Sequence, residues 1–153
     1  MVSIIIPTYN RVSLLSRAIK SVLSQTFKDF EFIIVDDGST DNTKDMVEGF
    51  QRMDARVKYF RQENSGTPAS PLNTGIKYAK GQYMAFLDDD DEWLPLKLEK
   101  QIALFQISKK PNLGIVSCGC FMIRGDKIKI YQFPATDNIL QLLLDKSVFL
   151  SCS

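Results

Sequence analysis

Short apolar runs alternate with amphipathic segments along the first two thirds of the sequence, and this alternation constrains the fold most. The apolar runs are rich in the β-branched and aromatic side chains of buried strands. They fall at residues 2–6, 30–35, 57–60 and 83–87. Each is followed by apolar residues at helical spacing. Repeated strand–helix pairs predict right-handed crossovers and an α/β fold, with a mostly parallel central sheet and helices on both faces.

Capping and breaker residues predict where the helices lie. Ser13 is expected to be the N-cap of the first helix, and Asp41 is expected to cap the second. The third helix is predicted at residues 72–79, and a fourth follows Pro95. These boundaries place every strand end next to a loop that leads into a helix.

The pattern changes beyond Pro111. Two strands at 114–123 and 127–133, joined by a Gly-Asp turn, are predicted to form a hairpin, and a helix is predicted at 138–146. The sequence ends in an apolar run without a closing polar turn. We therefore expect the natural protein to continue beyond Ser153.

The sequence contains no histidine. Ser-His-Asp and Cys-His catalytic sets are therefore excluded, as are zinc sites with imidazole ligands, and acid–base chemistry falls to carboxylates, Lys or Tyr. The formal net charge is only +1, so no global basic field gathers nucleic acid or an anionic membrane. Three Cys without a C-x-x-C pair indicate reduced thiols. Because no apolar run approaches the roughly 20 residues of a membrane span, we expect a cytoplasmic protein.

Acidic residues follow two of the predicted strands directly. Asp36 and Asp37 come after the run at 30–35, and Asp88-Asp89-Asp90-Asp91-Glu92 comes after the run at 83–87. Ligands of open α/β sheets bind beyond the carboxyl ends of the strands, so one crevice is expected to collect both groups.

Adjacent carboxylates need a counter-charge. Like charges about 4 Å apart repel by roughly 1 kcal/mol in water and roughly 4 kcal/mol at an effective dielectric of about 20. Mg²⁺ or Mn²⁺ suits carboxylate oxygens and also accepts phosphate oxygens. The alternative is a solvated acidic turn that caps a helix. An EF-hand is excluded because Trp93 stands where that loop needs Gly, and the glycines of P-loop and dinucleotide motifs are absent.

Four motifs resemble those of the family 2 inverting glycosyltransferases in order and spacing. They are Ile6-Pro7-Thr8-Tyr9-Asn10-Arg11, Gln25-Thr26-Phe27, Val35-Asp36-Asp37-Gly38-Ser39-Thr40-Asp41 and Phe86-Leu87-Asp88-Asp89-Asp90-Asp91-Glu92-Trp93-Leu94. The resemblance implies a GT-A fold, a nucleotide-diphospho-sugar donor, and Mn²⁺ or Mg²⁺ bound through the D-x-D element. It also implies one domain over 1–153, with a nucleotide-binding half at 1–110 and the incomplete start of an acceptor-side half at 111–153.

The same resemblance implies roles for individual residues. Asp37 contacts the base. The alternative is a purely structural role, in which Asp37 caps the turn at Gly38. Asp90 is the direct metal ligand, with Asp88 beside it. The expected nucleotide-sugar contacts are Pro7, Thr8, Tyr9, Arg11, Asp37, Asp88 and Asp89.

The implied reaction is attack of an acceptor hydroxyl on the anomeric carbon of a sugar nucleotide, a UDP-sugar by expectation, with inversion. The acceptor is expected to be a saccharide or a lipid-linked saccharide of polysaccharide biosynthesis, handled in the cytoplasm or at the inner face of the membrane. Two departures stand out. Leu72 occupies a position where members often carry Arg, so Arg11 or Lys77 is left to supply a cation. The catalytic base is expected beyond Ser153.

Three other functions remain open at this point. A sugar nucleotidyltransferase needs a Gly-rich basic loop after the first strand, which residues 7–11 do not provide. A phospho-acceptor signalling domain also combines paired acids with a metal, but places them after other strands. A non-catalytic nucleotide-sugar-binding fragment fits the motifs as well as an enzyme does.

Overall fold

The computed structural model describes residues 1–109 and 113–132 of the chain. It divides into two compact units, Met1–Glu99 and a second that begins at Lys100. The first unit contains the four-stranded sheet and the predicted site. The second contains a hairpin.

The first unit is built on a parallel sheet in the strand order β3-β2-β1-β4. Its strands are β1 (Val2–Thr8), β2 (Phe30–Asp36), β3 (Val57–Arg61) and β4 (Tyr83–Phe86). The helices between them are α1 (Val12–Leu23), α2 (Thr43–Met53) and α3 (Ala69–Tyr78). The predicted α/β fold with a parallel central sheet is confirmed.

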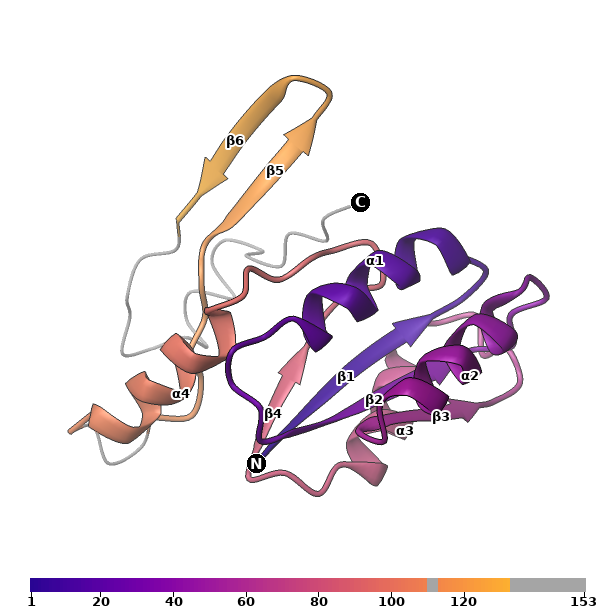
Figure 1. Ribbon diagram of the computed structural model, residues 1–153, viewed down its shortest axis with the longest axis horizontal. Coiled ribbons are helices and arrows are strands. Elements are labelled where there is room, and N and C mark those ends of the chain that lie inside the picture. The colour runs from indigo at the N-terminus through magenta and orange to yellow at the C-terminus, as the bar shows by residue number, and fades with distance from the viewer. Residues whose placement is uncertain (110–112, 133–153) are drawn as a thin grey trace. The chain divides into compact units, whose positions relative to one another are not determined.

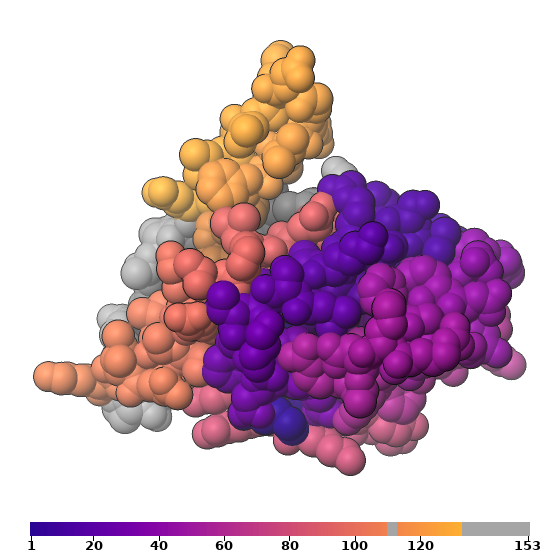
Figure 2. Space-filling model, in the orientation of Figure 1, coloured from indigo at the N-terminus to yellow at the C-terminus, as the bar shows by residue number. Residues whose placement is uncertain are grey.

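The strand order decides which face each helix covers. The β1-α1-β2 and β2-α2-β3 crossovers step the same way across the sheet, whereas α3 leads back past β1 to β4. With right-handed crossovers, α1 and α2 share one face and α3 takes the other. Figure 1 shows α1 and α2 side by side, and in Figure 2 their indigo and magenta atoms cover the strands behind them.

The face that α3 covers has a small, dense apolar core. Ile5, Ile33 and Val35 are fully buried there, and Leu72 of α3 packs against them. Gly75 brings the helix onto β1, because a Cβ at that position would lie 2.4 Å from the Ile5 Cγ2 atom. The close approach leaves no room for any other residue type without a shift of the helix.

The helix starts differ in part from the predictions. Ser13 is not the N-cap of α1, because the helix already begins at Val12 and Arg11 precedes it. The Val12 N–H instead donates to the Asp41 carboxylate, whose other oxygen accepts from the Thr43 N–H at the start of α2. The N-cap position of α2 is Asn42 rather than the predicted Asp41, but the Asp41 side chain serves both helix N-termini.

The later helices and the hairpin follow the sequence pattern with shifted ends. α3 begins three residues before the predicted 72–79, since the N–H groups of a first helical turn need no helical acceptor and Pro71 is tolerated there. α4 (Lys97–Ile107) follows Pro95. β5 (Cys120–Arg124) and β6 (Lys127–Tyr131) pair antiparallel, so the hairpin is confirmed, but the predicted strand over 114–123 is too long. The predicted helix at 138–146 lies outside the described residues.

A buried carboxylate ties three strands together at the amino-terminal edge of the sheet. Glu31 of β2 accepts hydrogen bonds from the Ser3 hydroxyl at 2.6 Å and from the Lys80 N–H at 2.6 Å, and it pairs with Lys58 of β3. Burial alone would raise the pKa of Glu31, but these donors outweigh it and hold the pKa below the ordinary 4.5.

Replacing Glu31 by glutamine is expected to lower the free energy of unfolding by about 2 kcal/mol, because a neutral amide binds Lys58 weakly and accepts fewer bonds. Since the folded pKa is depressed, Glu31 contributes stability above pH 4.5 that is lost as the pH falls through its folded pKa. Urea titrations at pH 7 and pH 3 should therefore show a smaller difference between variant and parent at pH 3. An equal difference at both pH values would contradict this account.

Candidate functional site

The predicted site lies at the point where the strand order of the sheet reverses. The chain leaves β1 toward β2 on one side, while β4 lies on the other side of β1. Open α/β sheets bind ligands at such a point, beyond the carboxyl ends of the strands.

Thr8, the last residue of β1, contacts both acidic clusters. Its carbonyl oxygen accepts the Asp37 N–H at 2.9 Å, and its hydroxyl donates to Asp89 Oδ2 at 2.7 Å. Asp37 comes from the loop after β2 and Asp89 from the loop after β4. Two acidic residues more than fifty positions apart in the sequence, Asp37 through its backbone and Asp89 through its carboxylate, are therefore both bonded to Thr8.

Arg11 supplies positive charge to the same region. Its Nη1 atom donates to Asp89 Oδ1 at 3.1 Å and to Asp90 Oδ2 at 3.0 Å. Asp89, more strongly than Asp90, raises the pKa of Arg11 above its ordinary value. Both oxygens of the buried Asp89 carboxylate are thus engaged, one by Thr8 and one by Arg11.

Asp37 is buried and its carboxylate is held by donors from one loop. The Gln62 side chain donates to Oδ1 at 2.6 Å, and the Ser65 N–H donates to Oδ2 at 3.1 Å. The Ser65 hydroxyl adds a further contact. Asp36 has a different environment, because its oxygens accept from the Ser39 N–H and the Tyr59 hydroxyl, which leaves it a structural role.

Gln62 is itself fixed by α3. Its amide nitrogen also donates to Ser70 Oγ at 2.9 Å, and its amide oxygen accepts from the Thr74 hydroxyl at 2.6 Å. Asp37 is therefore oriented through Gln62 by a helix rather than by a loop alone.

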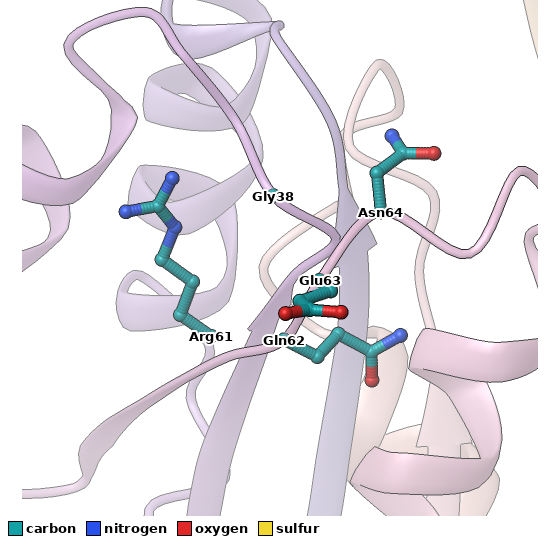
Figure 3. A pocket seen from close by; sticks show the side chains of 5 residues that line it. All are labelled: Gly38, Arg61, Gln62, Glu63 and Asn64. Atoms are coloured by element: carbon teal, nitrogen blue, oxygen red, sulfur yellow. The ribbon is translucent and has the colours of Figure 1, made fainter.

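An open pocket of about 480 Å³ lies beside Asp37. Figure 3 shows its lining residues, which are Gly38, Arg61, Gln62, Glu63 and Asn64. Gly38 has a φ of +86°, and a Cβ there would lie 2.8 Å from the Asn64 nitrogen, so this turn requires glycine. The Gly38 turn of the third motif thus lets the loop after β3 approach the loop after β2.

The acidic run is anchored at both ends. The Leu87 N–H donates to the Ile5 carbonyl at 3.1 Å. After the run, the buried Gln25 side chain donates to the Leu94 carbonyl at 2.8 Å and accepts the Leu98 N–H at 3.1 Å. These contacts explain the Gln25-Thr26-Phe27 motif physically, since it clamps the segment that follows the carboxylates onto the end of α1.

The run keeps more negative charge than Arg11 neutralises. Burial, with the neighbouring carboxylates Asp90 and Asp89, raises the pKa of Asp88. Burial and the same kind of repulsion, from Asp90 and Asp88, raise the pKa of Asp91 to about 6. A divalent cation fits this uncompensated set of oxygen donors. Within residues 1–109 and 113–132, however, no three acidic or thiol side chains already converge in a ready-made metal cage.

The remaining predicted residues are distributed around the same edge. Pro7 is half-buried beside Val35, and the Tyr9 side chain is 47% exposed. Trp93 is buried. Leu72 packs into the apolar core under the sheet, so no cation stands there, and Lys77 is exposed on α3.

Gln62, Ser65 and Thr74 belong to none of the motifs and are not predicted as site residues from the sequence. The available signal was the polar, breaker-rich stretch directly after residues 57–60, at the carboxyl end of the third predicted strand.

Comparison with known proteins places the chain in a family. Residues 3–134 match the family described as Glycosyl transferase family 2. The chain belongs to this family. A similar curated protein is UDP-Glc:alpha-D-GlcNAc-diphosphoundecaprenol beta-1,3-glucosyltransferase WfgD of Escherichia coli, 37% identical over 152 residues. That match covers 99% of this chain and 58% of WfgD, so the chain spans little more than half of that relative's length.

Solved structures agree on the fold. The mannosyltransferase PcManGT of Pyrobaculum calidifontis, in complex with GDP-Man and Mn²⁺, aligns with a TM-score of 0.69 and 25% identity over 76% of this chain and 34% of PcManGT. S. aureus TarS 1-349 in complex with UDP-GlcNAc aligns with a TM-score of 0.66 and 33% identity over 69% of this chain and 31% of TarS 1-349. The predicted GT-A fold is confirmed.

Proposed function

We propose that this chain forms the nucleotide-sugar-binding part of a metal-dependent, inverting glycosyltransferase that uses a UDP-sugar. Residues 1–110 bind the donor, and 111–153 begin the acceptor-side half. The observation that carries the proposal is the convergence at Thr8, which bonds the backbone of Asp37 and the carboxylate of Asp89 at the switch point of a GT-A sheet. Membership in glycosyl transferase family 2 supports the same activity.

The site divides its work between two groups of side chains. Asp37, held by Gln62 and Ser65 beside an open pocket, accepts an N–H of the uracil base. Pro7, Thr8 and Tyr9 form the wall of the turn against the nucleotide. Asp88 and Asp89 would serve the ribose and the metal's water ligands, and Asp90, with Asp88, would hold Mn²⁺ or Mg²⁺. When bound, that ion neutralises the diphosphate as the bond to the sugar breaks.

The acceptor is proposed from the relatives. WfgD acts on a saccharide carried by diphosphoundecaprenol, as its name states, and its name gives a UDP-Glc donor and a beta-1,3 linkage. A lipid-linked saccharide acceptor at the inner face of the membrane is therefore the proposal for this chain as well. Among the described residues, no helix has the length and apolar character of a membrane span.

The proposal is tested by titrating UDP into the chain by calorimetry, with and without Mn²⁺. We expect binding in both conditions and tighter binding with the metal. A folded chain that binds neither UDP nor Mn²⁺ would overturn the proposed function.

Replacing Asp90 by asparagine is expected to weaken UDP binding about tenfold in the presence of Mn²⁺ and to leave metal-free binding unchanged, because a neutral amide is a poor ligand for a hard cation. The matched control is Glu92→Gln, which removes one charge from the same run at a residue paired with Arg17. Equal losses in the two variants would show that total charge, and not ligation by Asp90, sets the affinity.

A further inference from the structure

We propose that Arg11 is an internal counter-cation that occupies the metal-binding carboxylates until a divalent ion displaces it. The inference rests on the proposed function, since it takes Asp90 as a metal ligand. It adds a competition between Arg11 and the divalent ion for the same carboxylates. The chain supplies its own cation to the site, and a bound metal must replace that cation.

The contacts of Arg11 define the competition. A single nitrogen, Nη1, lies 3.0 Å from Asp90 Oδ2 and 3.1 Å from Asp89 Oδ1. A divalent ion bound to Asp90 Oδ2 at roughly 2.1 Å would lie close to the guanidinium nitrogen that is 3.0 Å from the same oxygen, and the two cations would repel each other. Binding through the other oxygen of Asp90 places two cations on one carboxylate, and their repulsion favours departure of the side chain.

Arg11 is able to leave without a change in the backbone. On one side of it, the Asn10 N–H donates to Ser39 Oγ at 2.9 Å, and Asn10 Oδ1 accepts the Thr40 N–H at 2.7 Å. On the other side, the Val12 N–H donates to Asp41 at 3.1 Å. The backbone is thus held by the loop before α2, whereas the Arg11 side chain is 49% exposed, so its guanidinium has solvent to turn into.

The released guanidinium has a partner when the nucleotide is present. Arg11 follows Thr8 and Tyr9 in the turn proposed to face the donor, and guanidinium groups bind phosphate oxygens through two parallel N–H donors. Metal binding releases Arg11 from Asp89 and Asp90, and the diphosphate then binds the released guanidinium. Each ligand therefore makes the binding of the other more favourable. This linkage predicts that UDP and Mn²⁺ each tighten the binding of the other.

The test measures Mn²⁺ binding to the 153-residue chain without nucleotide, from the electron paramagnetic resonance signal of free Mn²⁺. Arg11→Gln is expected to bind Mn²⁺ about tenfold more tightly than the parent, because a cation in contact with a carboxylate opposes a second cation there. Arg11→Lys, which keeps the charge, should stay within about threefold of the parent. Arg17→Gln makes the same charge change at an arginine paired with Glu92 and should change the affinity less than about twofold.

A second measurement repeats the titration with UDP present. In the parent, UDP should strengthen Mn²⁺ binding, and in Arg11→Gln most of this gain should disappear. Unchanged or weaker Mn²⁺ binding by a folded Arg11→Gln variant overturns the competition and leaves the proposed function standing. Absence of Mn²⁺ binding by the parent and by Arg11→Gln, even with UDP, overturns both.

Discussion

Replacing Asp37 by alanine is expected to weaken UDP binding about 100-fold, with or without Mn²⁺. The carboxylate is proposed to accept a hydrogen bond from the base, and a bond to a charged group contributes about 1.5–3 kcal/mol, where 1.4 kcal/mol is a factor of ten. The substitution also releases the Gln62 and Ser65 donors that Asp37 now satisfies beside the pocket. Calorimetric titration of UDP measures both conditions.

The independence from metal is what separates Asp37 from Asp90. Loss of a base contact lowers both affinities by the same factor, whereas loss of a metal ligand lowers only the affinity measured with Mn²⁺. Asp29→Ala is the control, because Asp29 is an exposed acid immediately before β2 whose partner is the amino terminus. If Asp37→Ala weakens UDP only when Mn²⁺ is present, the proposed contact with the base is wrong.

Replacing Gly75 by alanine is expected to lower the free energy of unfolding by about 2 kcal/mol. The added Cβ meets Ile5 Cγ2 at 2.4 Å, and Ile5 is fully buried in β1 between neighbouring strands. Overpacking of this kind costs about 1–3 kcal/mol. We expect the upper end of this range because β1 is hydrogen-bonded to a strand on each side and cannot shift away from α3. The better helix propensity of alanine offsets only about 1 kcal/mol of the strain.

The same substitution at a matched glycine is expected to change the free energy of unfolding in the opposite direction. Gly49 lies within α2, and the nearest atom to a Cβ there is 4.0 Å away at the end of the Arg52 side chain. Gly49→Ala should therefore raise the free energy of unfolding by about 0.5–1 kcal/mol. In a double-mutant cycle, Ile5→Ala should reduce the penalty of Gly75→Ala, since it removes the clashing methyl group. Additive effects would show that the contact is not the cause. Denaturant titration measures all four variants.

The local pattern of the sequence was enough to predict the elements of the first unit. Apolar runs and helical spacing depend on neighbours in the chain, and the four predicted strands match β1 to β4 within two residues at either end. The first residues of the helices were predicted less accurately. Ser13 is a good capping residue in isolation, yet the Val12 N–H is satisfied by Asp41, which lies 29 positions further along. A cap supplied from another loop cannot be recognised from the helix's own sequence.

The sequence by itself determined the strand–helix order and excluded histidine chemistry. It also predicted that carboxylates gather at the carboxyl edge of the sheet. The last of these follows because parallel strands end on the same side. Only the tertiary structure decided the partners of those carboxylates. Thr8 and Arg11 meet Asp89 across about eighty positions, and Gln62 meets Asp37 across twenty-five. Hydrogen bonds depend on distance and direction between side chains, and these are set by how the sheet is assembled rather than by any short stretch of the chain.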